Sequence, residues 1–176
     1  MNNMENLRQT DQVIRGWLKE IRKDVLGELH DPLSVAEKSS RKDLVTNVDK
    51  ANEKRIIKYI RELDPEAKIL GEEGQGDRVT DMQGHVWIID PLDGTLNFVK
   101  QRDNFAVMIA LYIDGTGVLG YIMDVMRDII YGGGLQLGVF NQSGQLPKPA
   151  NISLKDGLLG VSGPMLIHDK YHLQAI

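Results

Sequence analysis

Two aspartates stand three residues apart in the stretch 87-WIIDPLDGTLNFV-99. Asp90 ends an apolar run, a proline follows it, and Asp93 comes directly before Gly94 and Thr95. Proline fixes φ and has no N–H, so a turn of this kind can direct both carboxylates at one point. Like charges that close repel unless a cation lies between them. Oxygen ligands suit a hard ion such as Mg²⁺ better than zinc, so the stretch indicates a magnesium-type site.

The residues after the second aspartate suit an anion. Gly94 and Thr95 can open a helical turn whose free backbone N–H groups and dipole attract a phosphate. A metal beside a phosphate cradle is a layout for phosphoryl transfer. The alternative is ordinary turn chemistry, in which Asp93 caps its own backbone. For this stretch taken alone, both interpretations stay open.

Two earlier stretches carry further acids. In 69-ILGEEGQG-76 a strand-like Ile-Leu runs into two glutamates, which form either ligands or a solvated acidic loop. In 43-DLVTNVDKANEKRI-56, Asp49 can simply cap a helix, and Thr46 can share that capping. Three such signals in this order favour a chemical site over three unrelated turns.

Hydrophobic periodicity predicts the elements that position these residues. Residues 6–27 have one apolar stripe and predict an amphipathic helix ending near Gly27, residues 31–48 form a polar connection, and residues 49–63 predict a second helix that ends before Pro65. Short apolar runs then predict strands in an antiparallel meander. These runs are 86–90, 105–113, 118–123, 129–131 and 137–140. The sequence therefore predicts an α+β fold.

Composition narrows the class of protein. The chain has 176 residues, with 41% hydrophobic and 26% charged residues, which is enough for one large domain or slightly more. Its formal net charge of −4 argues against a nucleic-acid surface. It has no cysteine, which excludes disulfides and thiolate sites and fits a reducing cytoplasm. From the polar N-terminus we expect no signal peptide, and from the lack of a long apolar run we expect no membrane span.

The C-terminal part predicts a second unit that is only begun. Residues 158–162 predict one more strand, and residues 164–176 predict the start of a helix. We therefore expect a metal- and phosphate-binding α+β domain over residues 1–157 and the start of a truncated C-terminal domain over residues 158–176.

The motifs DLVTNVD, GEEG and WIIDPLDGTLNFV, in this order, resemble those of the inositol monophosphatase family, within the Mg²⁺-dependent, lithium-sensitive phosphatase superfamily. The resemblance implies two N-terminal helices packed on a mostly antiparallel sheet. This is the N-terminal part of the layered αβαβα sugar-phosphatase fold, with the C-terminal αβα part missing.

The resemblance also implies roles for particular residues. Two or three Mg²⁺ ions, with Mn²⁺ as a substitute, would be held by Glu72, Asp90, the Leu92 carbonyl and Asp93. Glu72 would be catalytic together with Thr95, which would bond Asp49 and help to activate the attacking water.

Other roles implied by the resemblance concern the substrate and its surroundings. Asp93 and the backbone N–H groups of Gly94 and Thr95 would bind the substrate phosphate, and Lys38 and Glu73 would give support at most. We expect surface or structural roles for the histidines, which are His30, His85, His168 and His172.

The implied activity is Mg²⁺-dependent hydrolysis of a small phosphate monoester, above all inositol monophosphate, by a metal-activated water in a cytoplasmic homodimer. Fructose bisphosphate and adenosine bisphosphate are alternative substrates. A different alternative is a binding or regulatory module that associates with the transcription machinery.

One departure from the family pattern concerns a later tryptophan–aspartate motif, which supplies a further metal ligand. Neither Trp17 nor Trp87 is followed by aspartate. We therefore expect a truncated chain with a weakened second metal site and poor or absent catalysis.

Overall fold

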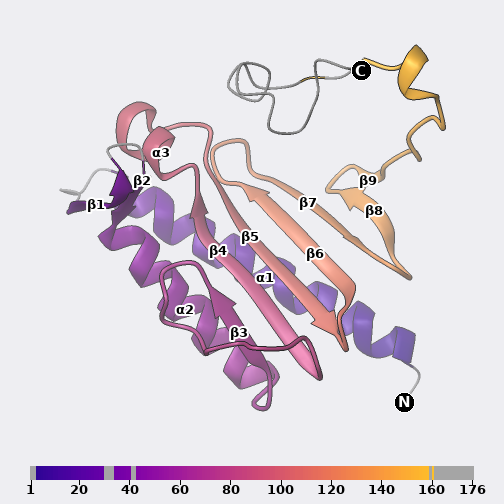
Figure 1. The fold of residues 1–176 in the computed structure, drawn as a ribbon, viewed down its shortest axis with the longest axis horizontal. Helices are drawn as coiled ribbons and strands as arrows, with labels where there is room; N and C mark the ends of the chain where they lie inside the picture. The colour runs from indigo at the N-terminus through magenta and orange to yellow at the C-terminus, as the bar shows by residue number, and fades with distance from the viewer. Residues whose placement is uncertain (1–2, 30–33, 41–42, 159, 161–176) are drawn as a thin grey trace. The chain divides into compact units, whose positions relative to one another are not determined.

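The structure is a computed structural model that describes residues 3–29, 34–40, 43–158 and 160 (Figure 1). The chain divides into two compact units, residues 1–146 and residues 147–176. Every element that positions the predicted site belongs to the first unit. In the second, a short 3₁₀ helix, Leu154–Asp156, begins at Ser153, whose hydroxyl accepts from the Lys155 N–H. The predicted domain boundary after residue 157 stays a prediction.

The described residues contain the two helices that periodicity predicted and a third, short one at the expected turn after Gly94. Helix α1 spans Asn3–Glu28, and the centre of its apolar stripe, Ile14, Leu18, Ile21 and Val25, is fully buried, in agreement with the helix predicted over residues 6–27. Helix α2 spans Asn47–Leu63, two residues longer at its start than predicted, and helix α3 spans Thr95–Gln101. None of the helices in the described ranges combines the length and apolar character that crossing a membrane requires.

Seven strands form the main sheet, and their order in space follows their order in the chain. They are β3 Lys68–Gly71, β4 His85–Asp93, β5 Ala106–Ile113, β6 Thr116–Asp124, β7 Ile129–Gly134, β8 Gly138–Asn141 and β9 Gly144–Gln145. Strand β3 runs parallel to β4, and each later neighbour is antiparallel. The predicted α+β fold with a mostly antiparallel sheet is confirmed.

The segment before α2 contains a small second sheet. Strands β1 (Val35–Ser40) and β2 (Asp43–Thr46) pair antiparallel, with Val35 opposite Thr46. The prediction of a polar connection over residues 31–48 was therefore wrong for these residues. A two-stranded ribbon satisfies its backbone by hydrogen bonds between its own strands, so it needs few apolar side chains that a periodicity could reveal.

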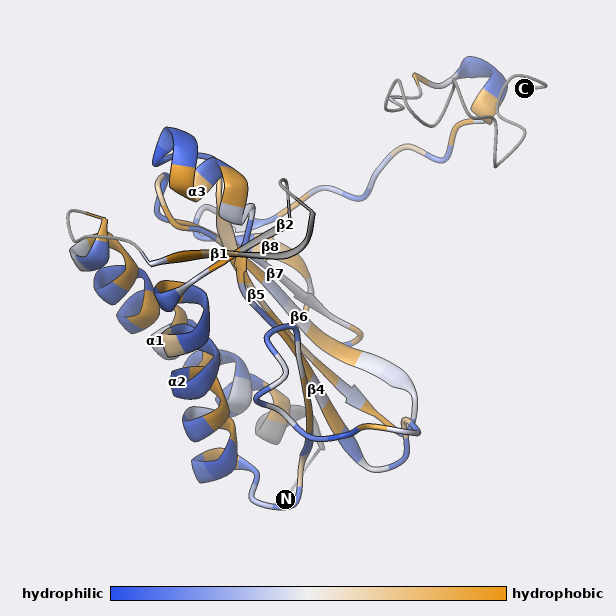
Figure 2. Ribbon diagram, turned by 60° about the vertical axis from the view of Figure 1, so that its left-hand side comes forward, coloured by the Kyte–Doolittle hydropathy of each residue, from blue (hydrophilic) through white to orange (hydrophobic). Residues whose placement is uncertain are grey.

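The two long helices cover one face of the main sheet (Figure 2). Trp17 on α1 stacks on Tyr59 of α2 with ring centroids 5.6 Å apart, and it lies 6.2 Å from the ring of Trp87 on β4. Arg22 extends from α1 and donates to the Val125 carbonyl at 2.8 Å. Aromatic packing therefore joins both helices to the sheet, and each buried aliphatic side chain between them adds about 1.5–3 kcal/mol.

The final elements predicted from the sequence fall largely beyond the described residues. Leu158 and Gly160 are not in a strand. The remaining positions of the predicted strand 158–162, and all of the predicted helix 164–176, lie outside the part of the chain that the structure describes.

Gly132 on β7 allows a test of how this strand packs against the side chains of Phe140 and Tyr121. A Cβ on Gly132 would lie 2.3 Å from Cε2 of Phe140 and 2.9 Å from Cδ1 of Tyr121, whereas a Cβ on Gly120 of β6 meets nothing within 4 Å. We expect Gly132→Ala to lower the free energy of unfolding by about 1–3 kcal/mol through overpacking. Gly120→Ala should leave it unchanged or raise it slightly. Urea unfolding of both variants checks this, and equal effects would contradict the packing described.

Candidate functional site

The parallel pairing of β3 with β4 brings two acidic residues to one edge of the sheet. The register places Lys68 opposite Val86 and Gly71 opposite Ile89. The next residue along each strand is an acid, Glu72 on one and Asp90 on the other. Parallel neighbours run in the same direction, so the residues that follow this pair on the two strands lie side by side. The pairing of strands alone therefore brings the two acids together.

A β-bulge then separates Asp90 from Asp93. Asp90 pairs with Met108 and Asp93 with Ala106, so two residues of β4, Pro91 and Leu92, oppose one residue of β5. Proline fits here because a bulged residue has no ladder partner for an N–H. The Leu92 N–H bends back and donates to Asp90 Oδ1 at 3.1 Å. The turn predicted from the Asp-Pro-Leu-Asp run is this bulge.

Asp90 has a strongly perturbed acidity. Burial, together with the charge of Glu72, a hydrogen bond to Glu72 and the charge of Asp93, raises the pKa of Asp90 to about 7, and the Leu92 N–H acts in the opposite direction. Two carboxyl groups this close to each other repel when both are charged, which favours a shared proton or a bound cation. The donor set is made of carboxylate and carbonyl oxygens, which fits a hard divalent ion.

Glu72 and Asp90 do not by themselves form a complete metal site. Among the described residues, no group of three or more histidine, cysteine, aspartate or glutamate side chains is arranged to hold a metal ion. Glu72 and Asp90 meet, whereas Asp93 is exposed one bulge further along β4. The chain therefore provides a convergent pair with a third acid near it, and the assignment of all four predicted ligands, including the Leu92 carbonyl, stays a prediction.

Beside the acids lies a network centred on Asp49. Thr95 Oγ1 donates within reach of two acceptors, Asp49 Oδ1 at 2.9 Å and the Leu92 carbonyl at 3.0 Å. Asp49 Oδ2 accepts from the Thr46 N–H at 2.9 Å, and the Thr46 side chain caps α2 in return. The hydrogen bond between Thr95 and Asp49 expected from the resemblance is confirmed. The capping role expected for Asp49 and Thr46 is confirmed as well.

Helix α3 begins at Gly94, its N-cap residue, with φ 84° and ψ 34° and no side-chain cap. The alternative in which Asp93 caps its own backbone stays a prediction. A Cβ on Gly94 would approach the Asn104 carbonyl to 3.0 Å, so both conformation and space require glycine. The first N–H groups of a helix have no intrahelical partner, which leaves those after Gly94 for an anion.

Two further polar residues belong to this region and were missed from the sequence. Asn52 and Glu53 of α2 are 1% and 0% exposed. The Asn52 amide reaches the Pro91 carbonyl at 3.5 Å, and Glu53 accepts from two amides of the loop after β3. A signal existed: the apolar stripe of Ile56 and Ile60 continues backwards at helical spacing onto these polar residues.

The structure describes only some of the other residues named from the sequence, which are Glu73, Lys38 and the four histidines. Glu73 lies in the loop after β3, with its N–H held by Glu53. The side chain of Lys38 is outside the described part. His85 pairs with Asp64 at 2.8 Å, which confirms a structural role for it. The other three histidines lie outside the described residues.

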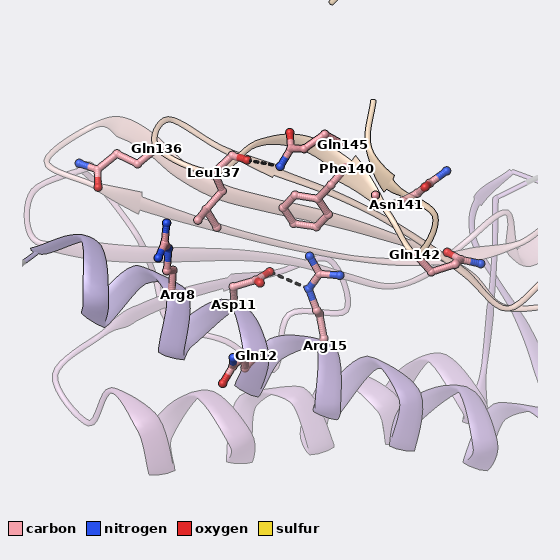
Figure 3. A pocket seen from close by; sticks show the side chains of 11 residues that line it. Arg8, Asp11, Gln12, Arg15, Gln136, Leu137, Phe140, Asn141, Gln142 and Gln145 are labelled. Carbon is pink, nitrogen blue, oxygen red and sulfur yellow. Dashed lines mark hydrogen bonds and ion pairs between the residues drawn. The ribbon is translucent and has the colours of Figure 1, made fainter. Parts of the chain in front are cut away.

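A separate hollow lies between α1 and the β8–β9 hairpin (Figure 3). Its central charges pair with each other, because Arg15 donates to Asp11 at 2.9 Å and lies 4.0 Å above the ring of Phe140. The Tyr121 hydroxyl also donates to Asp11, at 2.8 Å. Burial and Asp11 raise the pKa of Tyr121, which therefore stays protonated. The contacts that Asp11 and Arg15 make in this hollow join α1 to the sheet. No predicted site residue lines the hollow.

Comparison with known proteins points to one family. The model of the inositol monophosphatase family matches residues 6–169. Inositol-1-monophosphatase of Bacillus subtilis is 36% identical over 167 residues, covering 95% of this chain and 63% of that protein. The Nus factor SuhB of Escherichia coli is 41% identical over 121 residues, covering 66% of this chain and 45% of SuhB.

Solved structures agree with the sequence comparison. An IMPase/NADP phosphatase complexed with Mg²⁺ and phosphate matches with a TM-score of 0.77 and 32% identity, over 86% of this chain and 57% of that one. A staphylococcal inositol monophosphatase in a lithium-soaked inhibitory complex matches with a TM-score of 0.78 and 31% identity, over 84% and 56%. The chain thus spans less than two thirds of each of these relatives. On the family match and the fold together, this chain belongs to the inositol monophosphatase family.

Proposed function

We propose that this chain provides the metal- and phosphate-binding part of a Mg²⁺-dependent phosphatase for small phosphate monoesters. The observation that carries the proposal is the meeting of Glu72 with Asp90 beside the hydrogen bond from Thr95 to Asp49. Glu72 and Asp90 offer oxygen ligands to a cation, and Thr95 offers a hydroxyl group that is hydrogen-bonded to Asp49. A metal ion can activate a water molecule, and a hydroxyl of this kind can orient that water for attack on a phosphate group.

The acidic residues would hold the metal. Glu72, Asp90, Asp93 and the Leu92 carbonyl are the proposed ligands, and Mn²⁺ is the expected substitute. A divalent cation bound there would neutralise phosphate charge and activate water. The relative solved with Mg²⁺ and phosphate supports this choice of ion. The number of ions, two or three, is the part of the proposal that rests on family resemblance alone.

The pair formed by Thr95 and Asp49 would orient the attacking water. Because Asp49 is an acceptor for the Thr95 proton, the lone pairs of Thr95 Oγ1 stay available to accept a hydrogen bond from water. Asp49 is 1% exposed and fixed by Thr46, so it holds the hydroxyl in one orientation. A water molecule that donates a hydrogen bond to Thr95 would be held in line for attack on the phosphate. Holding the attacking water in this orientation is the contribution we assign to Thr95 and Asp49.

The turn after Asp93 would hold the substrate phosphate. The N–H groups of Gly94 and Thr95 open α3, and the left-handed conformation of Gly94 lets a ligand approach the backbone closely. Asp93 would contribute on the metal side. Inositol monophosphate is the proposed substrate because of the similarity to the Bacillus enzyme. Fructose bisphosphate and adenosine bisphosphate stay as alternative predictions.

A second candidate function comes from another class of protein. The 41% identity to SuhB, a Nus factor, favours an association with the transcription machinery. The net charge of −4 argues for a protein contact rather than a nucleic-acid contact. Copurification of RNA polymerase with this chain, set beside phosphate release, separates the two functions. The expected homodimer and the cytoplasmic location stay predictions.

Metal binding should appear as added stability. We expect Mg²⁺ at about ten times its dissociation constant to raise the melting temperature by about 3–6 °C, because a ligand that binds only the folded state stabilises it by about 1.4 kcal/mol through mass action. Asp90→Asn should abolish this increase by removing a ligand. Asp81→Asn, at an exposed surface pair with Lys68, should preserve it. Thermal unfolding with and without Mg²⁺ makes the measurement, and an increase that survives Asp90→Asn would contradict the assignment.

Hydrolysis should depend on the Thr95 hydroxyl. We expect Thr95→Val to bring the weak Mg²⁺-dependent phosphate release expected of this chain down to the rate without Mg²⁺, since valine keeps the shape and removes the hydrogen bonds. Thr80→Val, at an exposed position, is the matched control. Equal rates for both variants would count against the role of Thr95. A wild-type rate comparable with that of the Bacillus enzyme would contradict the expected weakened second metal site.

A further inference from the structure

Glu53 is a completely buried carboxylate that the proposed chemistry does not use. It lies on α2 with 0% exposure, surrounded by the residues that close the acidic edge of the sheet. Burying a polar or charged group is unfavourable unless hydrogen bonds replace its water. A glutamate retained in such a place must therefore satisfy both carboxylate oxygens within the protein.

The partners of Glu53 are backbone amides of one loop. Its Oε2 accepts from the Glu73 N–H at 2.6 Å, and its Oε1 accepts from the Gln75 N–H at 2.8 Å. The Gln75 side chain donates in turn to the Lys50 carbonyl of α2 at 2.8 Å. Three hydrogen bonds thus tie the loop after β3 to the first turns of α2. The first bonded amide belongs to the residue that directly follows Glu72.

The residue that precedes Glu72 has to be glycine for this arrangement. A Cβ on Gly71 would lie 2.3 Å from Glu53 Oε1 and 2.7 Å from Glu53 Cδ. The carboxylate cannot move aside cheaply, because both of its oxygens are held by amides. Gly71 therefore lets the Glu53 carboxylate lie against the end of β3, and the carboxylate fixes the residues on the far side of Glu72.

The other end of the loop is fixed independently. Asp77 accepts from the Ile69 N–H at 2.8 Å and from Arg61 at 2.6 and 2.7 Å. These bonds do not involve Glu53, so we expect the far end of the loop to stay in place when Glu53 is changed. The effect of Glu53 on the residues next to Glu72 can therefore be measured without unfolding the whole loop.

We propose that Glu53 is the positioning residue for Glu72, and that it sets the affinity of the acidic edge for a divalent cation. The inference rests on the proposed function, because it takes Glu72 as a metal ligand. Glu53 acts without being a ligand itself: its carboxylate holds the amides that follow Glu72 and lies against Gly71, which precedes it. Glutamine does not replace it, since its NH₂ group would face a backbone N–H where the carboxylate accepts. Groups that orient a ligand in this way typically contribute 10–100-fold to metal affinity.

The test compares Glu53→Gln with Glu62→Gln, which changes an exposed glutamate of the same helix. Gly71→Ala is the second variant, because it displaces the Glu53 carboxylate without removing it and answers the question if Glu53→Gln fails to fold. Two readouts are taken on folded wild-type protein and variants: hydrogen exchange at the amides of Glu73 and Gln75, and Mn²⁺ binding by electron paramagnetic resonance. A purely stabilising role would lower the melting temperature without changing Mn²⁺ binding by the folded protein.

We expect Glu53→Gln and Gly71→Ala to speed exchange at both amides and to weaken Mn²⁺ binding about 10–100-fold, with Glu62→Gln unchanged. Mn²⁺ binding within twofold of wild type in a folded Glu53→Gln or Gly71→Ala protein overturns the role of Glu53 alone. A wild-type chain that binds no Mn²⁺ overturns the metal site itself, and the role of Glu53 with it.

Discussion

The parallel pairing of β3 with β4 is the constraint on which the site depends. It is the single parallel pair in a sheet that is otherwise antiparallel in the described residues, and its register delivers Glu72 and Asp90 side by side. Two neighbouring carboxylates repel each other when both are charged, unless a cation or a shared proton compensates. Burial, together with the charge of Glu72, raises the pKa of Asp90. The pairing of β3 with β4 therefore favours a bound cation or a shared proton between Glu72 and Asp90.

Helix α2 carries the positions that hold the surrounding loops. Asp49 reaches Thr95 at the start of α3, Asn52 reaches the bulge at Pro91, and Glu53 holds the loop after β3. These three residues lie at i, i+3 and i+4, on the face of α2 that further along carries the apolar core residues. One helix face thus joins three segments that are far apart in the sequence. The same helix is fixed to the sheet through Tyr59, Trp17 and Trp87.

Strong periodicity made the long elements predictable, whereas short elements escaped it. The apolar stripes of α1 and α2 and the runs in β4 to β7 lie within a few residues of their predicted limits. Strands β1, β2 and β9 are short, with two to six residues each, so their pairing leaves little periodicity in the sequence. The site residues came from motifs rather than from periodicity. Glu53 and Asn52 were missed because a charged or amide side chain on a helix is ordinarily expected at the surface.

The central claim is that acidic side chains from two separate segments trap a divalent cation at this edge of the sheet. The most direct measurement is a crystal structure of the chain soaked in Mn²⁺, with anomalous diffraction locating the ion. The account predicts an anomalous peak between the carboxylates of Glu72 and Asp90, with Asp93 or the Leu92 carbonyl beside it. Carboxylates that point apart, with no peak between them at saturating Mn²⁺, would contradict it.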